Sequence, residues 1–304
     1  MKATTSPPLI GIAAPADNLA EETLVRALAT LEQADLPMQL AGNVRLAHGR
    51  MAGDDAARAA GIMELSANKG VTHILLAAGG YGSGRILPLI DWAKVNPNQP
   101  WIGYSDNTAL INARIAKTGI GGWHGPMLKH LANGFVGIDK VCLREILSGQ
   151  APQGYASDVL PDVTVMKPGK ARGRLLGGNL AVLRSLLGTP YAPVPKDGDI
   201  LFIEDICETN YRIDRDLEQL AQAGWLERIG GLIFGNFSDI QDSSSRPFGF
   251  TVEEIFERHA ARVNGPVVMN FPTGHAGLNM PLPLGSTVIL EAGDSVRLTF
   301  EGVK

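Results

Sequence analysis

The chain has 304 residues, of which 45% are hydrophobic and 19% are charged, and its formal net charge is −4. This length suits one large or two medium domains, and the slightly acidic balance argues against a nucleic-acid-binding protein. No apolar run is long enough to predict a membrane-spanning helix. Cys142 and Cys207 lack metal or redox spacing and the N-terminus lacks a secretory signal, so we expect a cytoplasmic protein without a disulfide framework.

Strand and helix patterns alternate through the first half of the chain. The segments that predict buried strands are 9–14, 38–40, 73–77 and 101–102. The segments with helical spacing are 21–34, 54–68, 86–93, 108–117 and 139–147. Such alternation is typical of a parallel sheet covered by helices on both faces. We therefore predict an N-terminal α/β domain over residues 1–150.

The second half differs in character. Residues 151–172 contain Pro152, Pro161 and Pro168 with little periodicity, so we predict a linker there. Further on, the expected strands are 199–203, 231–235 and 267–269, with a closing hairpin formed by 287–290 and 295–299, and the expected helices are 180–187, 211–223 and 251–263. We predict a smaller, strand-rich α+β or barrel-like domain over residues 173–304.

Ser105 lies where an expected strand turns into a helix. The stretch from Trp101 to Thr108 reads Trp-Ile-Gly-Tyr-Ser-Asp-Asn-Thr. A serine at a tight strand-to-helix turn displays its hydroxyl beside clustered backbone N–H groups, as in a nucleophile elbow. Position 107 is Asn instead of the second glycine of G-x-S-x-G, so this stretch alone is equally compatible with a helix cap formed by Ser105 or Asp106.

A glycine-rich loop, Gly79-Gly80-Tyr81-Gly82, follows another buried strand. Glycines let backbone N–H groups approach an anion closely. One interpretation is half of an oxyanion hole, completed by the N–H of Asp106. The other is a phosphate-binding loop, although the spacing matches neither G-x-G-x-x-G nor the P-loop.

A serine nucleophile needs a base and an orienting acid. His275 lies in a glycine-flanked loop after a buried strand, where catalytic side chains are often displayed; a structural turn histidine is the alternative. His259 is expected at the surface of a charged helix. Glu204 ends an apolar strand, and a carboxylate there requires a partner. Asp205 and Glu208 compete with Glu204 for the role of orienting acid.

Two further features concern ligands. Arg212 and Arg215 share a helix face and could hold a peptide carboxylate, although surface ion pairs with neighbouring aspartates are the commoner outcome. His124 and His130 have no acidic partner at metal-binding spacing, so we predict no metal site.

The motifs together resemble the LD-carboxypeptidase family of serine peptidases, which includes the microcin C self-immunity peptidases. The matching stretches, in the family's order, are Ile12–Pro15, Gly79–Gly82, Gly103–Asp106, His124–Met127, Gly177–Leu180, Ile203–Asp205 with Tyr211–Arg215, and Gly274–Gly277 leading to Pro283–Gly285.

The resemblance implies a catalytic triad of Ser105 as nucleophile, Glu204 as orienting acid and His275 as general base. It implies an oxyanion hole formed by the N–H groups of Gly80 and Asp106. The implied fold is a flavodoxin-like N-terminal domain joined to a smaller, barrel-like C-terminal domain, with the site between them. A homodimer without metal or other cofactor is also implied. We predict substrate contacts from the following residues: Tyr81, Arg212, Gly125 and Asn179.

The implied reaction is hydrolysis of the L,D amide bond of murein tetrapeptide, which releases D-Ala during cell-wall recycling. One departure concerns Ala78, because many members have Arg at this position; Arg85 is a candidate replacement. Two alternatives stay open. A microcin-type hydrolase would cut peptide or acyl-sulfamoyl adenylates, with Trp123 as a candidate for stacking on the base. A non-enzymatic nucleotide-binding module would use the glycine loop.

Overall fold

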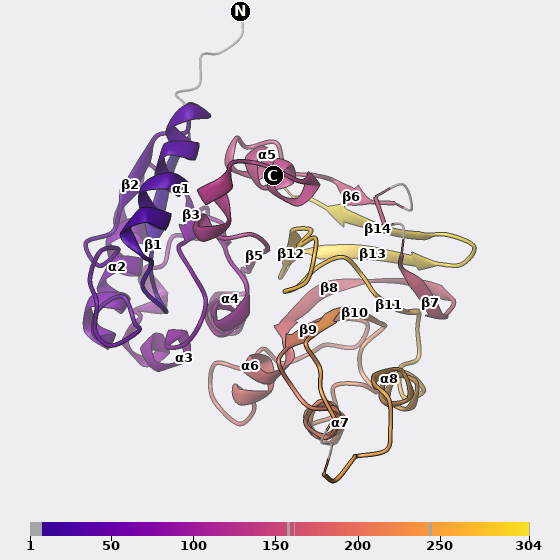
Figure 1. The fold of residues 1–304 in the computed structure, drawn as a ribbon. Helices are drawn as coiled ribbons and strands as arrows, with labels where there is room; N and C mark the ends of the chain where they lie inside the picture. The colour runs from indigo at the N-terminus through magenta and orange to yellow at the C-terminus, as the bar shows by residue number, and fades with distance from the viewer. Residues whose placement is uncertain (1–7, 157–158, 161, 243–244, 304) are drawn as a thin grey trace, which may run out of the picture. The chain divides into compact units, whose positions relative to one another are not determined.

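The computed structural model of the protein describes residues 8–156, 159–160, 162–242 and 245–303. The chain divides into two compact units, Met1–Ala151 and Pro152–Val303 (Figure 1). Within the described ranges, no helix combines the length and the apolar character needed to cross a membrane. Each unit is built on its own sheet, so the two are described in turn.

The first unit is built on a parallel sheet with the strand order β5-β4-β3-β1-β2. Its strands are β1 (Leu9–Ala13), β2 (Met38–Leu40), β3 (Val71–Leu76), β4 (Trp101–Ile102) and β5 (Gly122–His124). Its helices are α1 (Glu21–Gln33), α2 (Asp55–Ala67), α3 (Ser83–Ile86), α4 (Thr108–Thr118) and α5 (Ile138–Leu147), with short 3-10 turns η1 (Leu87–Leu89), η2 (Trp92–Lys94), η3 (Ser105–Asn107) and η4 (Leu128–Asn133). This order confirms the predicted flavodoxin-like arrangement.

The order of the first sheet defines where a ligand would bind. The chain runs outward in one direction from β1 to β2 and in the other from β3 to β4 and β5. In doubly wound sheets, ligands bind outside the carboxyl ends of the strands at this switch in direction. The loops that follow β1 and β3 meet there, and the second of them is the glycine loop, Gly79–Gly82.

The second unit contains a mixed sheet with the order β6-β14-β13-β8-β9-β10-β11-β7. Its strands are β6 (Gly154–Tyr155), β7 (Thr164–Lys167), β8 (Gly169–Asn179), β9 (Ile200–Ile206), β10 (Gly231–Ser238), β11 (Val267–Met269), β13 (Thr287–Ala292) and β14 (Val296–Glu301), and β12 (Leu282–Leu284) also belongs to this unit. Its helices are α6 (Leu180–Ser185), α7 (Asn210–Gln222) and α8 (Val252–Ala260). The strands β8 to β11 are parallel, and antiparallel strands flank them on both sides.

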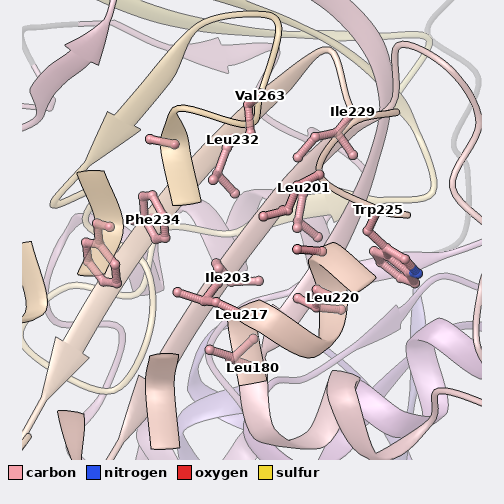
Figure 2. Packing of buried hydrophobic residues seen from close by; sticks show 14 of the residues in the cluster. Leu180, Leu201, Ile203, Leu217, Leu220, Trp225, Ile229, Leu232, Phe234 and Val263 are labelled. Carbon is pink, nitrogen blue, oxygen red and sulfur yellow. The ribbon is translucent and has the colours of Figure 1, made fainter. Parts of the chain in front are cut away.

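The core of the second unit lies between the parallel strands and the helices (Figure 2). Apolar side chains of β9 and β10, such as Leu201, Ile203 and Phe234, pack against residues of α7, such as Leu217 and Leu220. All five are inaccessible to solvent. The burial of so much apolar surface fixes the parallel strands, and with them the residues at their carboxyl ends.

Three details differ from the expectations for the second domain. Residues 151–172, predicted as a linker, contain β6, β7 and the beginning of β8, all paired within the sheet. The short edge strands are interrupted by Pro and Gly, so their periodicity was too weak to recognise. The second unit is consequently as long as the first instead of smaller. Among the described residues no pairing joins β6 to β7, so the sheet is open and no closed barrel forms.

Substitution of Gly177 tests whether the close contact between β8 and β9 requires glycine. Its φ is +127°, and a Cβ at this position would overlap the backbone carbonyl oxygen of Phe202. Gly177→Ala should lower the free energy of unfolding by about 3 kcal/mol or more, because backbone must move to make room. Gly188 also has a positive φ, +80°, but no atom lies within 4 Å of its Cβ position.

Gly188→Ala is therefore the matched control, and backbone strain alone should cost about 1 kcal/mol there. Urea titration of both variants and the unsubstituted protein measures the two losses. Equal losses would show that the close approach of β8 and β9 is not what requires glycine.

Candidate functional site

Ser105 has an unusual backbone conformation. It follows β4 and begins the η3 turn before α4, and its φ is +63°. Non-glycine residues rarely adopt this left-handed conformation, which costs about 1 kcal/mol or more and is concentrated at functional sites. The residue is half-buried. The turn thus has the strained strand-to-helix geometry that the sequence suggested for a nucleophile.

The glycine loop lies directly against Ser105. A Cβ placed on Gly79 would be 2.8 Å from the Ser105 Cβ and 2.9 Å from its Oγ. Only glycine fits at this distance, so the loop backbone runs beside the serine hydroxyl. At Gly80, φ is +103° and the Asp17 carboxylate occupies the place where a Cβ would be. Asp17 Oδ1 also accepts a hydrogen bond from the Tyr81 N–H at 3.2 Å.

Polar side chains connect the serine turn to the glycine loop. The buried Asn107 donates from Nδ2 to the Ala78 carbonyl at 2.9 Å, and its Oδ1 accepts from the Ser83 hydroxyl at 3.2 Å. The Ser83 N–H donates to Asp106 Oδ2 at 2.7 Å. Burial raises the pKa of Asp106, while its hydrogen bonds from Ser83 oppose that rise. Asn107, in place of the elbow glycine, therefore holds the two segments together.

Arg58 holds the glycine loop by hydrogen bonds, a role that was not predicted from the sequence. Its side chain is fully buried and donates from Nη1 to the carbonyls of Pro15 at 2.5 Å and Gly82 at 2.8 Å. It also pairs with Asp55. One signal was present, because Arg58 lies one helical turn before the apolar residue Ile62.

Arg85, the candidate replacement for the arginine that many family members have at position 78, belongs to the glycine loop region. Ala78 is buried, and Arg85 forms an ion pair with Asp55 at 2.8 Å on the exposed side of the loop. The buried guanidinium beside the loop is that of Arg58, which belongs to α2.

Glu204 and His275 form a buried pair in the second unit. Glu204 lies near the carboxyl end of β9 and is fully buried, and its Oε2 is 2.6 Å from His275 Nδ1. A Cβ on Gly274 would be 2.9 Å from the same carboxylate oxygen, so glycine is required for the loop to pass this close. Asn236 fixes the far side of the loop by donating to the Ala276 carbonyl at 2.6 Å.

Burial raises the pKa of Glu204, and the hydrogen bond and charge of His275 oppose that rise. The ionised carboxylate therefore depends on the histidine for its stability. Asp205 points to the opposite face of the strand and accepts from Asn179 Nδ2 at 2.8 Å; burial raises its pKa to about 6. Glu208 faces Arg212 at 3.5 Å. Of the three carboxylates considered, Glu204 is the one that contacts the histidine.

The residues predicted to contact substrate occupy different environments. Tyr81 has an exposed side chain and Gly125 is buried with its N–H donating to the Gly103 carbonyl at 3.3 Å. Asn179 is buried and caps α6 by accepting from the Val182 N–H at 3.1 Å. These positions make Asn179 part of the framework around Glu204, its register partner on β9.

Two histidines outside the expected site have structural partners. His259 is buried, not exposed, and its Nε2 lies 3.0 Å from Asp214 Oδ1. His130 Nδ1 accepts from the Met127 N–H at 3.0 Å, and its Nε2 lies 3.1 Å from the hydroxyl of Tyr104, the residue before Ser105. Burial lowers the pKa of His130 to about 4, so the neutral ring supports Tyr104 at neutral pH.

No group of three or more His, Cys, Asp or Glu side chains within the described ranges is arranged to hold a metal ion. The structure therefore groups the candidate residues into two sets. Ser105, Gly79, Gly80 and Asp106 come together in the first unit, whereas Glu204 and His275 come together in the second.

Comparison with known proteins gives consistent matches to both units. Residues 10–125 match the model of the LD-carboxypeptidase N-terminal domain, and residues 172–290 match that of the C-terminal domain. The chain is 33% identical to the probable murein peptide carboxypeptidase of Bacillus subtilis, over 99% of this chain and 94% of that protein. It is 28% identical to the microcin C7 self-immunity protein of Escherichia coli, over 75% of each chain.

A solved structure agrees with these matches. The muramoyltetrapeptide carboxypeptidase from Oxalobacter formigenes has a TM-score of 0.84 at 28% identity, covering 96% of this chain and 98% of that one. The two domain models, the extended similarity in sequence and the shared fold show that the chain belongs to the LD-carboxypeptidase family of peptidases.

Proposed function

We propose that this protein is a serine carboxypeptidase that removes the terminal D-Ala from murein tetrapeptide by hydrolysing an L,D amide bond. The observation that carries the proposal is the 2.6 Å hydrogen bond between the buried Glu204 carboxylate and His275 Nδ1. A histidine oriented in this way by a carboxylate is the base that a serine nucleophile requires. Relatives named as murein peptide carboxypeptidases support the substrate class.

In the proposed mechanism, Glu204 accepts the Nδ1–H of His275 and so leaves Nε2 unprotonated. Nε2 takes the proton of Ser105 as its Oγ attacks the carbonyl carbon of the scissile amide. The tetrahedral intermediate collapses to an acyl-enzyme when His275 returns that proton to the leaving amine of D-Ala. Water then attacks the ester with the same histidine as base, which releases the shortened peptide and regenerates Ser105.

The proposed oxyanion hole consists of the backbone N–H groups of Gly80 and Asp106. The Cβ position of the adjacent Gly79 is 2.9 Å from Ser105 Oγ, so this backbone has the proximity that such donors need. Each donor that is aimed at the developing oxyanion contributes about 3–4 kcal/mol to stabilisation of the transition state in comparable sites.

Two alternatives receive less support. Trp123, considered for stacking on an adenylate base, is only 3% exposed. The glycine loop, whose spacing matches neither phosphate-binding motif, packs against the Ser105 hydroxyl. Both observations favour the peptidase over a nucleotide-directed function.

Substitution of Ser105 tests the nucleophile. Ser105→Ala should reduce D-Ala release from murein tetrapeptide to the level of background hydrolysis, because no hydroxyl remains to form the acyl-enzyme. Ser105→Gly should be equally inactive, yet about 1 kcal/mol more stable than Ser105→Ala, because glycine accepts the φ of +63° without strain. Mass spectrometry of released D-Ala and urea titration give the two measurements. Substantial turnover by either variant would refute the assignment.

Substitution of Glu204 tests the orienting acid. Glu204→Gln preserves shape but favours the wrong tautomer of His275, so kcat should fall on the order of 10³- to 10⁴-fold. Glu208→Gln is the comparison, because Glu208 does not contact the histidine, and its activity should stay within a few-fold of the unsubstituted enzyme. A larger loss in Glu208→Gln than in Glu204→Gln would reverse the assignment.

The pH dependence follows from the raised pKa of Glu204. Activity requires the ionised carboxylate beside a neutral imidazole, so kcat/KM should rise with pH. Because burial favours the protonated acid, the acidic limb should lie above the ordinary glutamate range, with apparent pKa values that belong to the Glu204–His275 pair. Initial rates across a pH series measure this limb. A rate that is constant down to the ordinary glutamate pKa would contradict it.

A further inference from the structure

Lys129 carries a half-buried ammonium group without an ionic partner. The residue belongs to the η4 turn that follows β5, and its backbone N–H donates to the Ala77 carbonyl at 3.0 Å. Among the residues that the structure describes, no carboxylate lies within the 4.0 Å ion-pair distance of its Nζ. Burial lowers the pKa of Lys129, which shows that the charged form is partly desolvated.

The carboxylate that acts electrostatically on Lys129 is already engaged by other groups. Asp17 acts on Lys129 electrostatically, but its carboxylate already accepts hydrogen bonds from Arg50 Nη2 at 2.5 Å and from the Tyr81 N–H at 3.2 Å. An unpaired, partly desolvated ammonium is unfavourable, because it loses hydration and gains no compensating partner. An anion that enters from solvent would provide that partner.

The position of Lys129 relates it to the proposed nucleophile. Ala77, which accepts the Lys129 N–H, directly follows β3 and precedes the glycine loop by two residues. Gly79 of that loop is the residue that touches Ser105. Lys129 follows β5 but is tied by this hydrogen bond to the end of β3, and Asp17 and the glycine loop follow β1 and β3, between which the direction of the sheet order switches.

A carboxypeptidase substrate presents one anion at a fixed place. The terminal carboxylate is separated from the scissile carbonyl carbon only by the amide nitrogen and one Cα, so its binding group must lie close to the nucleophile. Around the glycine loop, Arg58 and Arg85 both pair with Asp55, and Arg50 pairs with Asp17. Lys129 is the cation in this group that keeps its charge available for a ligand.

We propose that Lys129 binds the terminal carboxylate of the C-terminal D-amino acid of the substrate. The assignment rests on the proposed peptidase function. It gives Lys129 the role for which Arg212 and Arg215 were candidates from the sequence; the Arg212 side chain faces Glu208 at 3.5 Å. A single ammonium at this place would confer specificity for a free C-terminus, because a peptide whose C-terminus continues or is amidated has no charge to match it.

The test compares two substrates and three variants. The substrates are murein tetrapeptide ending in D-Ala and the same peptide ending in D-alaninamide. The unsubstituted enzyme should prefer the acid by about 100-fold in kcat/KM, in the range measured for loss of one partner of a desolvated charge pair. Lys129→Met should remove this preference by lowering kcat/KM for the acid alone, mainly through a higher KM. Lys129→Arg should recover part of the preference. Lys69→Met, an exposed lysine before β3, should behave like the unsubstituted enzyme.

Direct binding separates failure of this assignment from failure of the proposed function. Ser105→Ala, with and without Lys129→Met, is titrated with both peptides by calorimetry. If binding of the peptide that ends in D-Ala depends on Lys129, the assignment of Lys129 is supported. Should the active enzyme nevertheless release no D-Ala, only the proposed reaction is refuted. Equal losses for acid and amide in Lys129→Met, or an unsubstituted enzyme that does not distinguish them, would overturn it.

Discussion

The contact between Gly79 and Ser105 constrains the rest of the first unit. A Cβ on Gly79 would lie 2.9 Å from the serine hydroxyl oxygen, so the loop after β3 and the turn after β4 must meet at backbone distance. Ser105 reaches this position only in a left-handed conformation. Asn107 and Ser83 maintain that conformation by hydrogen bonds between the two segments. The strain is therefore offset locally, as expected where a side chain must be displayed in one direction.

In the second unit the corresponding constraint is electrostatic. Glu204 is fully buried on a strand whose Leu201 and Ile203 side chains pack into the apolar core, and an unpaired carboxylate there would be costly. His275 compensates at 2.6 Å, and Gly274 permits its loop to approach the carboxylate. The same burial that raises the carboxyl pKa makes the hydrogen bond strong, because a low local dielectric strengthens charged interactions. Stability and orientation of the histidine thus have one origin.

The sequence predicted elements with strong periodicity and residues at the ends of strands. The parallel sheet of the first unit could be recognised from alternating strand and helix patterns. The turn at Ser105 and the position of Glu204 could be recognised because apolar runs stop there. Residues 151–172 could not, because their short edge strands depend on pairing with distant strands. The buried Arg58 was missed because it is satisfied by backbone carbonyls from two separate loops. Contacts between segments far apart in sequence leave little local pattern.

Each half of the proposed triad is organised by contacts within its own unit. Ser105 is held by the glycine loop and Asn107, and the pair of Glu204 and His275 is held by the core of the second sheet and the loop at Gly274. Groups that are fixed before substrate arrives lose little further conformational entropy in the reaction. A left-handed serine, a desolvated carboxylate and an unpaired ammonium at Lys129 are each unfavourable in isolation. The surrounding structure tolerates them at the carboxyl ends of parallel strands, and each is in the state that the proposed peptide chemistry would use.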